Sequence, residues 1–410
     1  MKTVLFEDEH YLNLLPLVYL RPVWELRCGA RMLQEKLPAE LSRELRFLAR
    51  DYLAKDHLPT GSSALELPED EAVLLLNGRW LLQPEDVARL KELGVNDALV
   101  NGDSLLACRA RAAELQKYHR RGVLDSVALR RERQPVDHPA RIVNYLWDAI
   151  AWNGEEMVRD YREIAPAGQI ASEIPPGVHL LNRTEITIGK NVRLKPGVVI
   201  DAENGPVWID DRVTVMANAV LEGPLFVGAG STIKIGAKIY ENTTIGPVCK
   251  IGGEVEGVIV QGYANKQHDG FLGHAYLGAW VNLGADTNNS DLKNNYGLIK
   301  AFVNGRPVDT GQRFLGLMMG DHSKSAINTM FNTGTIVGVN SNIFGAGFPQ
   351  KFVPSFSWGG SEQMSAYEYD KALEVARIVT ARRKIDFSEG HARIFRAVWE
   401  LAKQVEEREY

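Results

Sequence analysis

Residues 209–251 read IDDRVTVMANAVLEGPLFVGAGSTIKIGAKIYENTTIGPVCKI, and this stretch decides the fold. An aliphatic residue occupies every sixth position, at Ile209, Val215, Leu221, Val227, Ile233, Ile239, Ile245 and Ile251. Four residues after each of these comes a mostly small or β-branched residue, as at Val213, Ala219, Ser231, Ala237 and Thr243. A period of six fits neither an amphipathic helix nor a simple array of hairpins, and it is the signature of a hexapeptide β-helix.

The same rhythm extends in both directions along the chain. It begins at Ile188, Leu194 and Ile200, and it returns at Leu277, Leu283, Met319, Ser325, Phe331, Val337 and Ile343. Three hexapeptides form one triangular turn of about 18 residues, so that each aliphatic side chain meets its counterpart one turn above. We therefore predict a left-handed parallel β-helix over residues 186–348, with two irregular stretches at 257–273 and 286–316. Loops this long in a compact fold are usually functional or disordered.

The first 165 residues have a different pattern. Short apolar runs at 4–6, 72–76 and 98–100 resemble buried parallel strands, and the segments 39–53 and 84–93 have helical spacing. Alternation of strand and helix predicts an α/β domain over residues 1–165. Residues 141–163 resemble a connecting helix, and residues 166–185 are expected to form a linker.

The end of the chain, residues 349–410, is expected to form an extension with two helices, at 366–384 and 388–409. These segments contain no proline and, apart from Gly390, no glycine. We expect the helices to pack on or cap the β-helix, because an open last coil would expose unpaired strand edges.

Composition narrows the class of protein. A chain of 410 residues with a net charge of only −5 has no concentrated basic face for nucleic acid or a membrane surface. The three cysteines are scattered and unpaired in sequence, which indicates a reducing compartment. No stretch reaches the roughly 18 apolar residues of a membrane span, and acidic residues 7–9 interrupt any signal-like start. A cytoplasmic protein is therefore expected.

The densest polar cluster is NKQHDGFLGHAYLG at 265–278, followed by VNLGA at 281–285 and NNSDLKNNY at 288–296. This run resembles the acetyltransferase domain of the bifunctional UDP-N-acetylglucosamine pyrophosphorylase/glucosamine-1-phosphate N-acetyltransferase family. The shared features are Gly-His with a Tyr two residues on, Val-Asn-hydrophobic-Gly-Ala and an Asn-containing loop. The full chain is more similar still to the alternative, Bacteroidetes-type form of that family, often labelled a sugar nucleotidyltransferase.

The resemblance implies roles for several residues in this cluster. His274 would be the catalytic base, and a neutral imidazole suits the removal of a proton from an amine that attacks a thioester. The implied substrate-binding residues are Lys266, Tyr276, Asn282, Asn288 and Asn289. The implied co-substrate is acetyl-CoA, with its pantetheine in a groove between coils or subunits.

Other interpretations of these residues remain open. His268 and His322 also suit structural positions, and a three-histidine metal site with His274 is a further alternative that would require convergence across subunits. Asn-rich segments such as 288–295 also form turns.

The N-terminal domain lacks the glycine-rich loop of standard sugar nucleotidyltransferases after its first strand. The segment RPVWELRCGARM at 21–32 resembles the alternative family's own signature. By this resemblance Arg21, Arg27, Arg31 and Lys36 would bind the nucleotide, although arginines also serve in surface ion pairs. Asp103, in the Asn-Gly-Asp that follows a strand, is a candidate Mg²⁺ ligand, and a tight turn explains the same tripeptide.

The leading hypothesis is a two-domain enzyme. Its β-helix would transfer acetyl from acetyl-CoA to an amino sugar phosphate resembling glucosamine-1-phosphate. Its α/β domain would couple the sugar phosphate to a nucleoside triphosphate with Mg²⁺, giving UDP-N-acetylglucosamine, and the family resemblance implies a homotrimer. Two rivals remain, which are a sugar-1-phosphate uridylyl- or thymidylyltransferase whose β-helix only oligomerises, and a non-catalytic regulatory scaffold.

Overall fold

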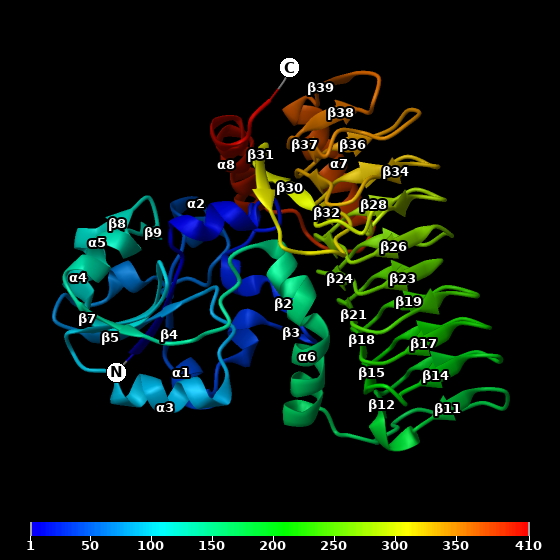
Figure 1. Cartoon of the computed structure of the whole chain (residues 1–410), viewed down its shortest axis with the longest axis horizontal. Coiled ribbons are helices and arrows are strands. Elements are labelled where there is room, and N and C mark those ends of the chain that lie inside the picture. Colours follow the sequence, from blue (N-terminus) through cyan, green and yellow to red (C-terminus); the bar gives the residue numbers. More distant parts are fainter. Residues whose placement is uncertain (1, 409–410) are drawn as a thin grey trace.

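The computed structural model describes residues 2–408, which form an α/β domain beside a parallel β-helix (Figure 1). The α/β domain holds a six-stranded sheet in the order β10-β6-β7-β5-β1-β4. Its strands are β1 (Lys2–Phe6), β4 (Leu45–Leu48), β5 (Ala72–Asn77), β6 (Asp97–Asn101), β7 (Ser104–Arg111) and β10 (Gln134–Asp137). β1 lies parallel to β4 and β5, whereas β7 is antiparallel to β5 and β6. The three strands predicted from apolar runs are confirmed.

The predicted helix at 39–53 is wrong. That segment forms α1 (Ala39–Ser42), then β4, then α2 (Asp51–Asp56). β4 pairs in parallel with β1, so backbone pairing at the edge of the sheet prevails over the local helical spacing. The second predicted helix is confirmed as α3 (Pro84–Glu92), and two short helices follow, α4 (Ala112–Tyr118) and α5 (Ser126–Arg131).

The connecting helix α6 (Leu146–Ile164) and the hairpin of β2 (Arg27–Cys28) and β3 (Arg31–Met32) lie between the domain and the β-helix (Figure 1). One apolar core joins the two parts. It includes Trp24 and Trp147 from the α/β domain, and Ile259 and Met318 from the β-helix. The two parts therefore share a buried interface.

Three parallel sheets form the faces of the β-helix. Sheet 1 contains β12 (Ile186–Ile188), β15 (Val207–Ile209), β18 (Leu225–Val227), β21 (Thr243–Ile245), β24 (Ile259–Val260), β27 (Tyr276–Leu277), β32 (Met318–Met319), β35 (Ile336–Val337) and β37 (Phe352–Val353). Sheet 2 contains β13 (Arg193–Leu194), β16 (Thr214–Val215), β19 (Thr232–Ile233), β22 (Lys250–Ile251), β25 (Asn265–Lys266), β28 (Asn282–Leu283), β33 (Lys324–Ser325), β36 (Asn342–Ile343), β38 (Ser357–Gly359) and β39 (Met364–Ala366). Sheet 3 contains β11 (His179–Leu181), β14 (Val199–Asp201), β17 (Val220–Glu222), β20 (Lys238–Ile239), β23 (Glu254–Glu256) and β26 (Phe271–Gly273).

The hexapeptide prediction is confirmed by the strand register. Val215 pairs with Ile233, and Val227 pairs with Ile245, in each case one rung above. Every aliphatic position that defines the period in residues 209–251 is buried in one continuous core. The fold class is the predicted left-handed parallel β-helix behind a nucleotidyltransferase-like domain.

The stretch 257–273, expected to be irregular, instead contributes β24, β25 and β26. Ile245 pairs with Val260 in the next rung, which makes this rung shorter than the ones below it. The shorter corner shifts the hexapeptide count, and the apolar rhythm is lost although the coil continues.

The second stretch, 286–316, is an insertion. It begins with β29 (Asn288–Asn289), which pairs with β34 (Met330–Phe331), and it then leaves the coil as a hairpin of β30 (Lys300–Val303) and β31 (Arg306–Asp309). The chain returns to sheet 1 at β32.

The strands of the coil also extend past both ends of the stretch 186–348. β11 lies within the expected linker and pairs with β14, while β37 and β38 pair with the rungs of β35 and β36. Backbone pairing with a neighbouring rung requires only extended chain, so residues outside the clear hexapeptide pattern join the coil.

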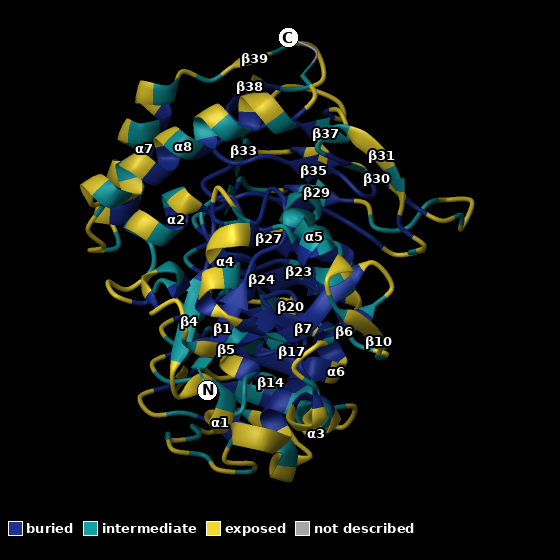
Figure 2. Ribbon diagram, turned by 90° about the vertical axis from the view of Figure 1, so that its left-hand side faces the viewer, coloured by how far each residue is buried: buried dark blue, intermediate teal, exposed yellow. Residues whose placement is uncertain are grey.

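The C-terminal segment forms β39, α7 (Tyr369–Ala381) and α8 (Glu389–Val405). β39 runs antiparallel to β38 and covers the last strand of sheet 2. α8 packs between the rungs and the α/β domain, where Arg393 forms an ion pair with Asp56 of α2. Figure 2 shows the exposed outer faces of α7 and α8 and the buried strands behind the α/β domain. No helix within residues 2–408 is long and apolar enough to cross a membrane.

Candidate active site

His274 occupies the corner between β26 and β27, with its backbone in the left-handed region at φ 44°. Its side chain is 27% exposed, and its Nδ1 lies 2.8 Å from Oδ2 of Asp291. The ring lies against Phe314, with 5.2 Å between ring centroids. A non-glycine residue in this backbone region is uncommon and is held there by its surroundings.

The insertion supplies both neighbours of the imidazole. Asp291 lies at its start and Phe314 near its end, and the two ends are joined by a hydrogen bond from Leu315 N to Asp291 O. Gly316 N donates to His274 O, which fixes the returning chain to the corner. The insertion therefore assembles the site, although it leaves the coil.

The pair has a definite chemical consequence. A carboxylate at Nδ1 holds the proton on that nitrogen and leaves Nε2 as the proton acceptor. Gly257 lies against this ring, because a Cβ at Gly257 would be 3.3 Å from Nε2 of His274. Any larger side chain at Gly257, which has φ 61°, would crowd the acceptor nitrogen.

An acidic edge of Glu222, Glu241 and Glu256 lies beside the corner. Burial raises the pKa of Glu256 above its usual value, with Asp291 and Glu241 contributing in the same direction and His274 opposing them. Burial also raises the pKa of Glu222, and Glu241 adds to this effect. The edge next to the imidazole therefore has an unfavourable excess of negative charge that a cationic group would relieve.

The asparagines predicted to contact substrate brace the rung below His274. Asn289 is buried, accepts a hydrogen bond from Gly273 N and donates one to Gly273 O. Asn288 accepts from Phe271 N and donates to Asp286. Both amides hold β26 in place, and their substrate roles stay predictions.

The other predicted substrate residues lie elsewhere. Tyr276 is 0% exposed, and its hydroxyl bonds to Arg27 at the interface with the α/β domain. Lys266 points inward, is 2% exposed, and donates to the carbonyl oxygens of Gly252 and His268. Asn282 lies on sheet 2, where it is next to Asn265. The structure does not bring these three side chains to His274.

The three candidate histidines are dispersed within the chain. His268 is exposed in the turn before β26, whereas His322 is buried at the corner between sheets 1 and 2. Among residues 2–408, no group of three His, Cys, Asp or Glu side chains could hold a metal ion. A single chain therefore does not form the three-histidine site.

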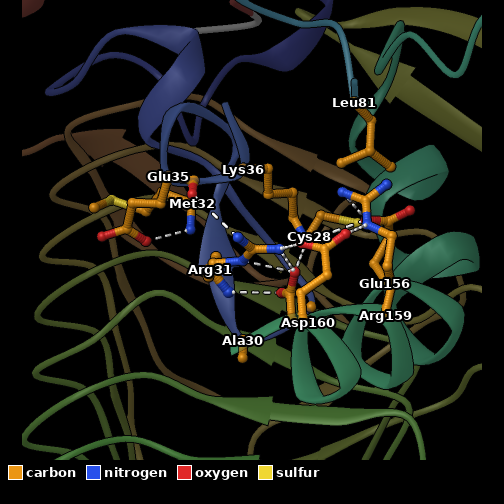
Figure 3. A network of polar contacts seen from close by, with 12 residues as sticks. Cys28, Ala30, Arg31, Met32, Glu35, Lys36, Leu81, Glu156, Arg159 and Asp160 are labelled. Carbon is orange, nitrogen blue, oxygen red and sulfur yellow. Dashed lines mark hydrogen bonds and ion pairs between the residues drawn. The ribbon is translucent and has the colours of Figure 1, made fainter. Parts of the chain in front are cut away.

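The predicted nucleotide-binding residues face the β-helix and α6 (Figure 3). Arg31 Nε lies 2.8 Å from Asp160 Oδ1, and Arg31 also pairs with Glu163. Lys36 Nζ lies 2.6 Å from Asp160 and 3.1 Å from Glu156. These charges fasten the β2–β3 hairpin to α6, so the structure gives both residues a structural partner.

Arg21 and Arg27 have partners on the β-helix itself. Arg21 forms a bidentate ion pair with buried Asp321, with 3.0 Å between Nη1 and Oδ1. Arg27 donates from Nε to the carbonyl oxygen of Gln261 and from Nη1 to that of Ala30. The nucleotide-binding roles of all four basic residues stay predictions.

The residues present do not fit a Mg²⁺ site in the α/β domain. Asp103 is 97% exposed and lies 3.6 Å from Arg130, far from any second carboxylate partner in the described contacts. Glu7 and Asp8, at the carboxyl end of β1, are fully buried and paired with Arg50 and Arg79. A hard cation requires free oxygen ligands, and these carboxylates are already neutralised.

Sequence reasoning missed Asp291, Phe314, Gly257 and Glu256. Asp291 lies in the Asn-rich run that drew attention to the region, but its distance from His274 depends on the fold of the insertion. No local signal in the sequence connects Phe314 to the corner.

Comparisons with known proteins agree with this architecture. Residues 3–167 match the family model described as sugar nucleotidyl transferase. The chain is 29% identical over 210 residues to the bifunctional protein GlmU of Synechococcus sp. (strain CC9311), which covers 50% of this chain and 40% of that protein. It is 29% identical over 151 residues to a bifunctional sugar-1-phosphate nucleotidylyltransferase/acetyltransferase of Sulfurisphaera tokodaii, covering 33% of this chain and 37% of that protein.

The match to a solved structure is weaker. LpxA, a UDP-N-acetylglucosamine acyltransferase from Bacteroides fragilis 9343, aligns with a TM-score of 0.30 and 19% identity over 55% of this chain and 91% of that chain.

A sugar nucleotidyl transferase domain in front of a hexapeptide β-helix defines a class of two-domain proteins. This chain belongs to the GlmU-like family within that class. The chain aligns with less than half the length of the GlmU proteins it matches.

Proposed function

We propose that the β-helix transfers an acyl group from a coenzyme A thioester to the amine of an amino sugar phosphate, with His274 as the general base. The observation that carries this proposal is the 2.8 Å contact of His274 Nδ1 with Asp291 at a half-exposed corner. This arrangement leaves Nε2 free to take the proton that the amine loses as it attacks the thioester.

The acidic edge supports an amine as the acceptor. An amino sugar is cationic near neutral pH, and the edge of Glu222, Glu241 and Glu256 would attract it. Transfer of the ammonium proton to Nε2 of His274 then gives the nucleophilic amine. Asp291 stabilises the imidazolium that forms.

The finer assignment is acetyl-CoA as donor and glucosamine-1-phosphate as acceptor. It rests on the Gly-His and Asn-loop resemblance and on the printed functions of the GlmU and Sulfurisphaera relatives. The predicted homotrimer and cytoplasmic location belong to the same proposal.

The test is the release of thiol by the purified chain given acetyl-CoA and glucosamine-1-phosphate. We expect His274→Ala to lower the rate by on the order of 10²–10⁴, the usual contribution of a general base. His268→Ala removes an exposed imidazole six residues away and should leave the rate unchanged. No thiol release from the wild type, or equal rates for His274→Ala and wild type, would refute the proposal.

The match of residues 3–167 supports a second activity, the coupling of the sugar 1-phosphate to a nucleoside triphosphate. Release of pyrophosphate in the presence of Mg²⁺ tests it. Pyrophosphate without thiol release would favour a nucleotidyltransferase with an oligomerising β-helix, and neither product would favour a regulatory scaffold.

A further inference from the structure

A second cavity of about 300 Å³ lies at a different corner of the β-helix, between sheets 1 and 2. Three parts of the chain enclose it, namely the segment 20–32 with His57, the corner residues around Trp280, and the helices α7 and α8 with the loop between them. His274, Asp291 and Phe314 are not among its lining residues. The cavity is therefore separate from the candidate active site.

Aromatic side chains form one wall. Tyr263 stacks on Trp280 with 4.5 Å between centroids, and Trp280 stacks on His322 at an interplanar angle of 19°. Phe395 of α8 meets His322 edge-on. Flat rings with apolar neighbours such as Met32 are the usual lining of a small-molecule site, and this volume is at the small end of such sites.

His322 contributes an unsatisfied polar group. It is 3% exposed, and within residues 2–408 its Nδ1 has no hydrogen-bond partner. Burial holds its pKa well below the usual value, with Lys324 and Arg21 acting in the same direction, so the imidazole is neutral. Buried polar groups are nearly always hydrogen-bonded, and a missing partner in a cavity wall indicates a ligand or water.

The charged groups around the cavity indicate the sign of that ligand. Arg21 is paired with Asp321, and Glu25 is paired with His57 at 2.8 Å. Burial and His57 both lower the pKa of His391, while the nearby Asp386 opposes them. Arg27 bonds only to carbonyl oxygens and has no carboxylate partner among the described residues.

We propose that this cavity binds a small planar aromatic or heteroaromatic anion, with its ring against the Trp280 wall and its carboxylate or phosphate on Arg27. His322 forms a hydrogen bond with a polar atom on the ring. Because three parts of the chain close around the cavity, the bound ligand bridges the α/β domain, the β-helix and the C-terminal helices.

Calorimetric titration of the full chain tests the proposal with three probes. Naphthalene-2-carboxylate and adenosine 5′-monophosphate carry the two candidate anions, and naphthalene-2-methanol is the uncharged control. We expect at least one anionic probe to bind, with the uncharged control at least about tenfold weaker. Binding by only one anion identifies the anionic group of the ligand.

Variants locate the site. Arg27→Gln should weaken the anionic probe by about tenfold and leave the uncharged control unchanged. Met32→Trp should fill the cavity and block both. Arg306→Gln, which replaces an exposed arginine of the β30–β31 hairpin, and His274→Ala should both leave binding unchanged.

Nuclear magnetic resonance of ¹⁵N-histidine-labelled protein gives an independent readout, in which the ring nitrogens of His322 should shift on binding. Three results would overturn the proposal: no binding by either anion at millimolar concentration, binding unaffected by both cavity variants, or probe-induced shifts at His274 in place of His322. His274→Ala separates this outcome from the acyltransferase proposal, because it removes thiol release and keeps probe binding.

Discussion

At the scale of single residues, the site depends on a pairing that sequence spacing does not reveal. Residues 265–296 attracted attention because they are dense in polar side chains, and His274 could be selected from its Gly-His context. Its partner Asp291 is 17 residues away. Only the folding of the insertion back to the corner brings the two together, so the sequence predicted the base and not the residue that orients it.

Replacement of Asp291 by Asn tests this pairing. The amide keeps the shape but loses the charge that stabilises the imidazolium, and it can favour the other tautomer. We expect kcat for thiol release to fall by on the order of 10–10³, less than for His274→Ala, with little change in KM. Asp286→Asn, a nearby exposed carboxylate, is the control. A rate equal to wild type for Asp291→Asn would show that the contact has no catalytic role.

At the scale of elements, the hexapeptide period predicted the coil wherever each rung has 18 residues. Ile251 of β22 pairs with Lys266 of β25 in the shortened rung. The inward position that elsewhere holds an aliphatic side chain there holds a lysine, which no pattern of apolar residues could indicate. Its amine is satisfied by carbonyl oxygens at the corner, which explains how the core tolerates it.

This lysine gives the β-helix a pH-dependent stability. Burial lowers the pKa of Lys266 from 10.5 to about 8, so between these pH values the unfolded chain binds a proton that the folded chain does not. The free energy of unfolding therefore rises with pH across this window, by at most about 3 kcal/mol for this residue.

Urea unfolding at pH 7.5 and pH 10 measures this effect. We expect Lys266→Met to lack the Lys266 part of the rise, so that the stability of the variant relative to wild type falls as the pH increases. Lys238→Met, at an exposed position of sheet 3, controls for loss of a surface charge. A difference between Lys266→Met and wild type that does not depend on pH would contradict the assignment.

At the scale of the whole molecule, the domain order could be predicted from the change of sequence period, but the docking of the parts could not. Arginines 21, 27 and 31 were expected to hold phosphates, and all three instead contact the β-helix or α6. A guanidinium suits a phosphate and a carboxylate equally well. The choice between them depends on long-range packing that sequence spacing does not contain.

The Arg21–Asp321 pair should couple the two parts. Arg21→Met leaves Asp321 buried without its partner, and we expect a loss of about 3–5 kcal/mol in the free energy of unfolding. The double variant Arg21→Met/Asp321→Asn should recover part of this loss, because no unpaired charge remains. Arg306→Met breaks an exposed pair with Glu407 and should cost about 1 kcal/mol or less. Equal losses for the single and double variants would show that the pair is not coupled.

The most direct test of the central claim is a crystal structure of the chain with glucosamine-1-phosphate and a non-reactive thioether analogue of acetyl-CoA. The account predicts that the amine nitrogen lies within roughly 2.6–3.2 Å of Nε2 of His274, with the acyl carbon beside it. An acceptor and acyl analogue bound together at any other part of the molecule would contradict it.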